Sequence, residues 1–300
     1  MKALVFGSVA FDTLEFPNGE RCDVALGGSA VYASLAASFF AVPQLVSVVG
    51  YDWNDDFAAR LQARNVDALG LEKRPSEKTF HWTGRYFDDM NERETIGSDP
   101  GVLKNAYAPI VPNEYKGTSI VFLGNMPPKS FSILLEQLDA PKFVVADTMK
   151  LYIDTERDAL LELLRRINGF TLNETEARAL TGETDPLSAA RKILELGPNF
   201  VILKLGSRGA LWVTRESYDS YPIYKTTAVD PTGAGDSFGG AFMGTIAEFD
   251  GVLSQESIRL ACLRATAVAS LTVEDVGTKR LERATREEVD ARVAALARQM

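Results

Sequence analysis

The chain contains one histidine and two cysteines among 300 residues, and this scarcity excludes several kinds of active site. A Ser-His-Asp triad, or a zinc site built from histidine and cysteine, would have to use His81, the single histidine. Cys22 and Cys262 do not make a disulfide framework, so we expect reduced thiols in a cytoplasmic protein. Any catalysis must rest on carboxylates, Lys and Arg side chains and backbone groups.

Excess positive charge and long apolar runs are also missing. The net charge of −9 argues against nucleic acid as a partner, because nucleic-acid binding needs a basic surface. The apolar run at residues 3–11 is too short to cross a bilayer and lacks the cleavage site of a signal peptide. We therefore expect no nucleic-acid partner and no membrane association.

Short β-rich runs alternate with helical patterns along most of the chain. The alternation predicts one α/β domain over residues 1–300, with a mostly parallel sheet covered by helices on both faces. The predicted strands are Leu4–Val9, Leu45–Val49, Ile120–Leu123, Phe143–Ala146, Phe170–Leu172, Val201–Lys204 and Ala210–Val213. The predicted helices are Ser29–Phe40, Asp55–Arg64, Ser130–Leu138, Asp154–Ile167, Glu174–Leu180 and Leu187–Leu196, and the chain reads as mostly helical after about residue 235.

Two segments, residues 11–25 and about 78–98, depart from this alternation. In the second, Phe80, Trp82 and Tyr86 recur with the period of two that is typical of a strand. We expect a small sheet of antiparallel strands that serves as a lid over a cleft. The alternative is an edge extension of the main sheet.

The most informative segment is DPTGAGDSF at residues 230–238. Gly233, Ala234 and Gly235 leave backbone N–H groups uncovered at the start of an apolar helix, where the helix dipole favours an anion. Asp236 would lie beside that anion and could accept a proton from an attacking hydroxyl. The segment therefore indicates phosphoryl transfer rather than simple helix capping.

Two further motifs could hold a nucleotide and its metal. Asn173 and Glu176 follow a predicted strand and could organise Mg²⁺, although the same pair also forms a good capping box. Lys204, Gly206 and Gly209 lie between two strands and would allow close approach of phosphates, although they also suit an ordinary hairpin.

A second glycine pair suggests where the phosphate acceptor binds. Gly27 and Gly28 open the helix that follows, and Asp12 lies shortly after the first strand. A small polyol could present its hydroxyl groups to Asp12 and to the backbone of the glycines. Packing glycines with a turn aspartate would give the same pattern.

Taken together and in this order, the motifs resemble the ribokinase-like (PfkB) family of carbohydrate and nucleoside kinases over nearly the whole chain. The resemblance implies a three-layer α/β fold with a β-sheet lid, and ATP with Mg²⁺ as phosphoryl donor. It implies that Asp236 is the catalytic base and that Gly233, Ala234 and Gly235 form the anion hole. The implied acceptor-binding residues are Asp12, Gly27, Gly28, Tyr32, Arg85 and Asp230. The implied nucleotide-binding residues are Asn173, Lys204, Gly206, Gly209, Thr266 and Gly277, with Glu176 and Asn173 placing Mg²⁺ through water.

Departures from the family pattern leave the acceptor open. Tyr32 stands where sugar kinases of the family often carry Asn, and the lid is unusually aromatic, with Phe80, Trp82, Tyr86 and Phe87. Lys150 lies where many relatives have an arginine nearby. The leading interpretation is a kinase for the hydroxymethyl group of a small sugar. A nucleoside kinase is the nearest alternative, and a non-catalytic sensor on the same fold is a more remote one. A monovalent cation near residues 274–278 and a homodimer formed through the lid are both compatible with the resemblance.

Overall fold

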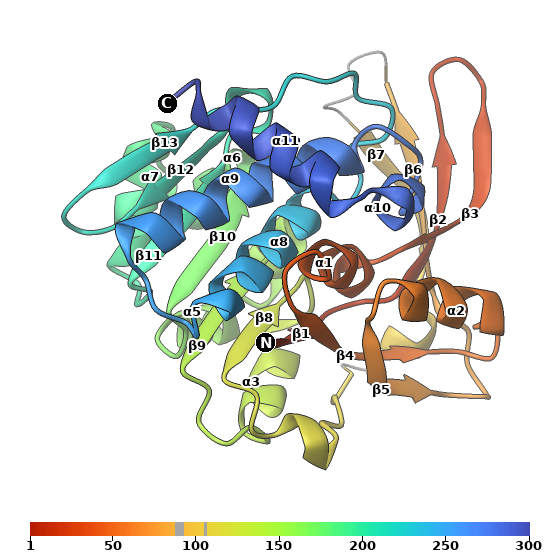
Figure 1. Ribbon diagram of the computed structural model, residues 1–300. Helices are drawn as coiled ribbons and strands as arrows, with labels where there is room; N and C mark the ends of the chain where they lie inside the picture. The colour runs from red at the N-terminus through yellow and green to blue at the C-terminus, as the bar shows by residue number, and fades with distance from the viewer. Residues whose placement is uncertain (88–92, 105–106) are drawn as a thin grey trace.

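The computed structural model describes residues 1–87, 93–104 and 107–300 (Figure 1). Its central sheet has the strand order β13-β12-β11-β10-β9-β8-β1-β4-β5. The strands from β11 to β5 run parallel, and β12 and β13 continue the sheet as an antiparallel hairpin. Their bounds are β1 Lys2–Phe6, β4 Val42–Val49, β5 Asp67–Lys73, β8 Ile120–Leu123, β9 Phe143–Asp147, β10 Gly169–Asn173, β11 Phe200–Lys204, β12 Ala210–Val213 and β13 Tyr218–Tyr221.

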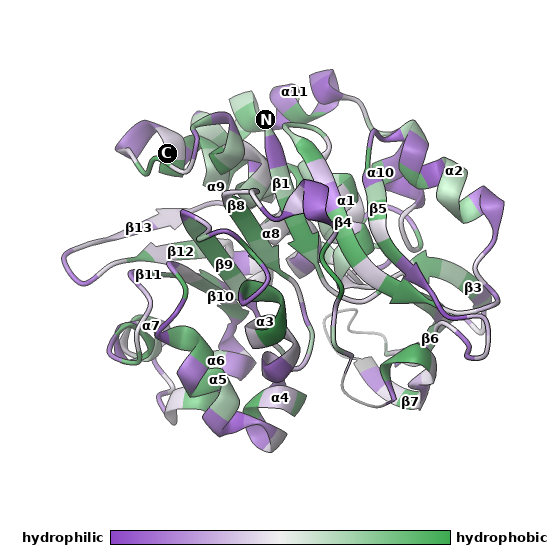
Figure 2. Cartoon of the chain, turned by 90° about the horizontal axis from the view of Figure 1, so that it is seen from below, coloured by the Kyte–Doolittle hydropathy of each residue, from purple (hydrophilic) through white to green (hydrophobic). Residues whose placement is uncertain are grey.

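Helices cover both faces of this sheet, which confirms the predicted three-layer α/β class. One apolar core lies under α1 Ser29–Ala37, α2 Asp55–Ala63, α8 Ala234–Glu248, α9 Gln255–Thr272, α10 Lys279–Arg283 and α11 Arg286–Ala297. The other lies under α3 Pro128–Leu135, α4 Lys150–Thr155, α5 Arg157–Leu164, α6 Glu174–Thr181 and α7 Pro186–Leu194. The strands between them are mostly hydrophobic in Figure 2, as a sheet buried on both faces requires.

A second, smaller sheet stands apart from the central one. Its order is β3-β2-β6-β7, with β2 Ala10–Glu15, β3 Arg21–Gly27, β6 Phe80–Tyr86 and β7 Arg93–Asp99. It is therefore a separate sheet and not an edge extension of the main one. The expectation of purely antiparallel strands was wrong in one respect, because β2 and β6 pair in parallel. Below, this small sheet is called the lid.

Several predicted boundaries were wrong for local reasons. β1 ends at Phe6 rather than Val9, because the chain turns toward the lid at Gly7, where a Cβ would lie 2.5 Å from Ser29 Oγ. The single helix expected over Asp154–Ile167 is two helices, α4 and α5, separated by Glu156 in a non-helical conformation (φ −131°, ψ 35°).

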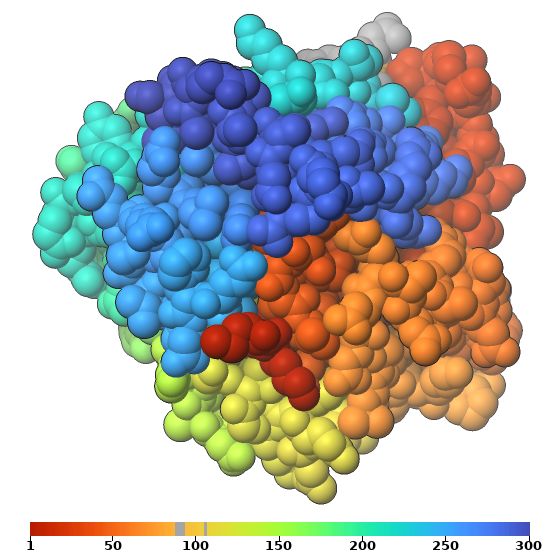
Figure 3. Space-filling model, in the orientation of Figure 1, coloured from red at the N-terminus to blue at the C-terminus, as the bar shows by residue number. Residues whose placement is uncertain are grey.

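The side of the sheet on which successive strands are added changes at β1. The chain adds β4 and β5 on one side of β1 and β8 to β11 on the other. In open α/β sheets, ligands bind beyond the carboxyl ends of the strands at such a switch point. The C-terminal residues, blue in Figure 3, pack against the N-terminal part of the chain, red and orange. No helix in the described ranges is long and apolar enough to span a membrane.

Candidate active site

The start of α8 is built from glycine because no other residue fits there. Gly233 caps the helix with φ +75°, a left-handed conformation, and a Cβ on it would lie 2.3 Å from the Tyr32 ring. Ala234, Gly235 and Asp236 form the first turn, and the N-cap residue Gly233 has no side chain that could cap it; the Ala234 N–H donates to the Pro231 carbonyl at 3.3 Å. The helix end therefore presents backbone N–H groups and partial positive charge to whatever binds there.

Lys204 adds a full positive charge beside that turn. It closes β11, and its Nζ lies 3.0 Å from the position that a Cβ on Gly235 would take. The same ammonium donates to Asp147 Oδ2 at the end of β9, at 2.7 Å. Burial works to lower the pKa of Lys204, but the charges of Asp147, Glu176 and Asp236 outweigh it and raise that pKa. Lys204 is therefore a largely buried cation next to the predicted anion site, with 16% of its side chain exposed.

Asn173 and Glu176 form the capping box that the sequence allowed as an alternative. Asn173 Oδ1 accepts from the Glu176 N–H at 2.9 Å, and Glu176 Oε2 accepts from the Asn173 N–H at 2.8 Å. Burial, and then the charge of Asp147, raise the pKa of Glu176 to about 7. The cap fixes both side chains at the carboxyl edge of the sheet, where Asn173 pairs in register with Lys204. Their role toward a metal stays a prediction.

The predicted acceptor residues lie where the lid meets α1: Asp12 and Gly27 belong to the lid strands β2 and β3, Gly28 caps α1, and Tyr32 lies in α1. A Cβ on Gly27 would lie 2.1 Å from Asp12 Oδ2, so the carboxylate rests on the glycine backbone. Gly28 caps α1 with φ +93°. The Tyr32 side chain is 1% exposed, and its hydroxyl has no hydrogen-bond partner among the described residues. Burial, followed by the charges of Asp230 and Asp12, raises the Tyr32 pKa, so the hydroxyl stays protonated.

Asp230 is fully buried, and its carboxylate accepts three hydrogen bonds instead of pointing into the cleft. Oδ1 accepts from the Thr232 N–H and from the Tyr86 hydroxyl, both at 2.9 Å, and Oδ2 accepts from the Gly277 N–H at 2.9 Å. A direct contact between Asp230 and the acceptor is therefore no longer expected. Gly277, predicted at the nucleotide, is a donor to this carboxylate.

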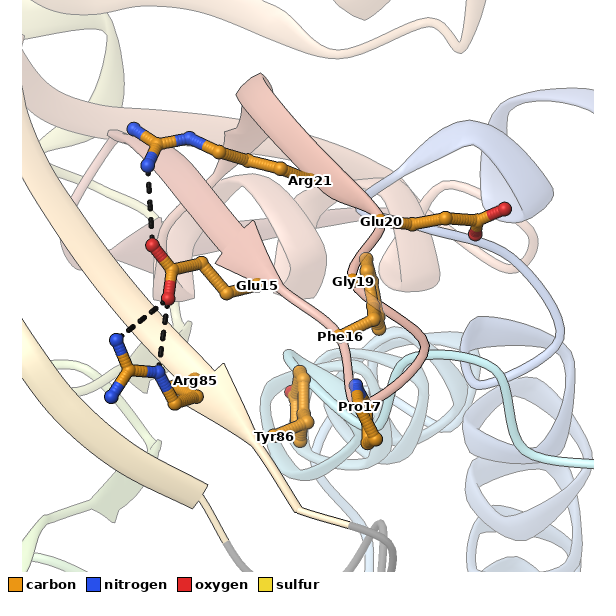
Figure 4. Close-up of a pocket in the computed structure, with 8 residues that line it drawn as sticks. All are labelled: Glu15, Phe16, Pro17, Gly19, Glu20, Arg21, Arg85 and Tyr86. Atoms are coloured by element: carbon orange, nitrogen blue, oxygen red, sulfur yellow. Dashed lines mark hydrogen bonds and ion pairs between the residues drawn. The ribbon is translucent and has the colours of Figure 1, made fainter.

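Arg85 does not reach the acceptor residues either. It pairs with Glu15 at 2.9 Å, while the adjacent Tyr86 points to Asp230 on the other face of the lid. Successive residues of a strand point to opposite faces, and Figure 4 shows the Arg85 guanidinium directed to Glu15 and away from the Tyr86 ring. The assignment of Arg85 to the acceptor is corrected accordingly.

The remaining predicted residues lie in the turn after β11 or within the core. Gly206 and Gly209, with φ +57° and +96°, bound the 3₁₀ turn between β11 and β12, which also contains Arg208. Arg208 pairs with Glu174. Thr266 is buried in α9 and donates to the Cys262 carbonyl at 2.9 Å, so its hydroxyl is satisfied within its own helix.

Asp147 and Asn125, at the carboxyl edge of the sheet, were not identified from the sequence, and a different role was considered for Lys150. Asp147, the polar last residue of an apolar strand, is the partner of Lys204, and that position was the available signal. Asn125 follows β8 at the switch point, and its Oδ1 is buried without a hydrogen-bond partner among the described residues. Lys150, considered as a substitute for an arginine, pairs instead with Asp154 on α4.

The family model for pfkB family carbohydrate kinases matches residues 4–284. The chain belongs to the pfkB family. A cytidine kinase from Thermococcus kodakarensis is 30% identical over 269 residues, covering 88% of this chain and 95% of that protein. A ribokinase from Lactococcus lactis is 28% identical over 276 residues, covering 87% and 88%. The fold matches the ribokinase from Thermotoga maritima with a TM-score of 0.77 at 24% identity, covering 97% and 99% of the two chains.

Membership of the pfkB family makes the protein a phosphotransferase that acts on hydroxyl groups. Kinases of this family use ATP with Mg²⁺, and a putative ribokinase II from E. coli with a TM-score of 0.79, 21% identical and covering 98% and 99% of the two chains, is a complex with both. The site described here fits that pair. Asn173 and Glu176 carry oxygen atoms of the type that Mg²⁺ prefers, and Lys204 with the first turn of α8 offers positive charge suited to phosphate oxygens. The described residues contain no cluster of three or more acidic, histidine or cysteine side chains that could hold a metal ion, so direct ligation by such a cluster is not expected there.

Proposed function

We propose that the protein transfers the γ-phosphoryl group of ATP to a hydroxymethyl group of a small sugar or sugar-like acceptor. The observation that carries the proposal is the position of Asp236 in the first turn of α8, beside the backbone N–H groups at the start of that helix and within electrostatic range of Lys204 and Tyr32. A carboxylate and an anion site on the same turn bring the acceptor hydroxyl and the phosphoryl group together.

Each residue then has one task. Asp236 accepts the proton of the acceptor hydroxyl, and the N–H groups of Gly233, Ala234 and Gly235 stabilise the charge on the transferred group. Lys204 neutralises phosphate oxygens, and Asn173 and Glu176 hold Mg²⁺, which when bound screens the charge of the triphosphate. Asp12, Gly27 and Gly28 orient the acceptor, with Tyr32 as the floor of the site.

A nucleoside acceptor is the second candidate. Trp82 pairs in register with Asp12, so both side chains lie on the same face of the lid. An aromatic ring next to the carboxylate that holds the acceptor suits a nucleobase as well as the apolar face of a sugar. The similarity to a cytidine kinase over 88% of the chain supports this candidate.

Other parts of the proposal concern partners and location. We infer ATP and one small molecule as the ligands, no nucleic acid, and a cytoplasmic protein, on the net charge and the two free cysteines. A monovalent cation near residues 274–278 and a homodimer through the lid belong to the same proposal.

A substrate panel tests the function directly. ADP release is measured with ribose, deoxyribose, fructose, cytidine, adenosine and inosine, and the phosphorylated product is identified by mass spectrometry. Asp236→Asn should lower kcat by about a thousandfold or more while leaving ATP affinity within about threefold. Asp219→Asn, the same change on the exposed strand β13, is the control. Tight binding of a sugar or nucleoside without product would instead favour the sensor, and near-normal turnover of Asp236→Asn would remove Asp236 from the role of base.

A further inference from the structure

A tyrosine of the lid, Tyr86, forms hydrogen bonds with residues just before the anion-binding turn. Tyr86 is the last residue of β6, 2% exposed, and its ring stacks on Phe16 with centroids 5.8 Å apart and planes 16° apart. Its hydroxyl donates to Asp230 Oδ1 at 2.9 Å and also shares a short hydrogen bond with Thr232 Oγ1. Because a tyrosine hydroxyl has one proton, Thr232 is the donor in the second bond.

The groups that Tyr86 contacts fix the conformation of the backbone just before α8. Thr232 immediately precedes Gly233, whose left-handed φ of +75° turns the chain into the helix. Asp230 also accepts from the Thr232 N–H, so the carboxylate, the Thr232 side chain and the Thr232 backbone form one closed set of hydrogen bonds. A hydroxyl from the lid therefore completes the arrangement that orients the first N–H groups of α8.

A second strand of the lid, β3, packs against the loop that binds the other oxygen of the same carboxylate. Gly277, which donates to Asp230 Oδ2, packs on β3, where its Cβ would lie 3.0 Å from the Ala25 Cβ. The tip of the β2–β3 hairpin lies near this junction and forms part of two open surface pockets, one lined also by Tyr86 and the other also by Val229 and Val276. Figure 4 shows Tyr86 beside Phe16 and Pro17 at this tip. Asp230 is thus one of the points at which the lid meets the rest of the molecule.

We propose that Tyr86 is a positioning residue that couples closure of the lid to assembly of the anion hole. With the lid closed, Tyr86 and Thr232 fix the turn and the N–H groups of Gly233 to Asp236 point at one place. With the lid open, Asp230 loses the Tyr86 donor, Thr232 loses its acceptor, and the turn is held less firmly. The site then becomes competent for transfer only when the lid covers the acceptor, which limits transfer to water.

This inference rests on the proposed phosphoryl transfer, but its first test does not require turnover. Hydrogen–deuterium exchange of the full-length protein without ligands is compared between wild type and Tyr86→Phe. We expect the amides of residues 232–236 to exchange about tenfold faster in the variant, because the hydroxyl lost is bonded to a buried carboxylate. Tyr107→Phe is the matched control, since that residue is also 2% exposed and the substitution removes a buried hydroxyl that donates to the Ser47 carbonyl, away from the turn.

Kinetics provide the second readout, with the acceptor that the substrate panel identifies. Tyr86→Phe should lower kcat about tenfold with the KM for ATP within about twofold, because the turn is needed in the transition state rather than for nucleotide binding. Combining Tyr86→Phe with Thr232→Val should cost little more than Tyr86→Phe alone, since both changes break the same set of bonds.

The outcomes separate this proposal from the proposed function. Unchanged exchange of residues 232–236 in Tyr86→Phe, or equal losses in Tyr86→Phe and Tyr107→Phe, would overturn the coupling role even if the protein is an active kinase. Faster exchange confined to the turn and the lid would support the coupling role even if no acceptor in the panel is phosphorylated. The lack of a phosphorylated acceptor would then count against the proposed function and not against the coupling role.

Discussion

Replacing Glu176 with glutamine should make the protein more stable and less active. Burial and the charge of Asp147 raise the Glu176 pKa from 4.5 to about 7. The folded protein therefore binds this proton more tightly than the unfolded chain does, and the wild type loses stability as the pH rises from 4.5 to 7. A shift of this size corresponds to about 3 kcal/mol above pH 7, at 1.36 kcal/mol for each pKa unit. Glutamine does not ionise, so Glu176→Gln avoids this loss.

The substitution keeps the helix cap, which isolates the effect of charge. The glutamine carbonyl can still accept from the Asn173 N–H, as Glu176 Oε2 does at 2.8 Å. In thermal unfolding without ligands, Glu176→Gln should differ little from wild type at pH 5 and unfold about 5 °C higher at pH 8. Stabilisation by ATP with Mg²⁺ should be weaker in the variant, because a carboxylate ligand is lost.

An exposed glutamate provides the control for this experiment. Glu183 pairs with Lys192 at the surface, with 41% of its side chain exposed, and Glu183→Gln should change stability by less than about 0.5 kcal/mol at either pH. The reasoning would be refuted by a Glu176→Gln variant that is no more stable than wild type at pH 8, or that gains the same amount at pH 5.

Two further substitutions test the turn and the buried cation. Gly233→Ala should inactivate the protein and destabilise it by about 2–4 kcal/mol, since it combines a left-handed φ with a Cβ only 2.3 Å from the Tyr32 ring. Gly182→Ala, at φ +78° with open space around it, isolates the conformational cost of about 1 kcal/mol, and both are measured by urea unfolding. Lys204→Met should cost about 3–5 kcal/mol and weaken ATP binding, because it leaves Asp147 buried without its cation. Adding Asp147→Asn should restore most of that stability but not the ATP affinity, as calorimetry would show; equal stability of the single and double variants would contradict this account.

The elements that could be predicted from the sequence are those whose local hydrophobic pattern matches their burial in the structure. The strands under both helical layers are apolar on both faces, so their positions could be predicted to within a few residues. β5 and β13 were missed because both are edge strands; Tyr218–Tyr221 is largely exposed and carries polar residues. The turn at the start of α8 could be recognised because its backbone conformation requires glycines, and these glycines are visible in the sequence.

Residues that act through distant partners could not be assigned in this way. Asp230 was assigned to the acceptor on the family resemblance, but two of its three donors come from a lid strand and from a C-terminal loop that no local pattern connects. Arg85 is a different case, since the period of two that puts Trp82 and Tyr86 on one face of β6 also puts Arg85 on the other. Asn125 carries no motif, and only the strand order reveals that it lies at the switch point.

The hydrogen bonds of Asp230 also determine when the site can form during synthesis. One donor lies 144 positions earlier in the chain and another 47 positions later. A ribosome releases the chain from its N-terminus, so the lid strands and the turn emerge well before Gly277 is available. The anion-binding turn therefore reaches its final geometry only when nearly the whole chain has been made. A nascent or truncated chain that ends before Gly277 would leave Asp230 Oδ2 without this donor, even after the sheet has folded.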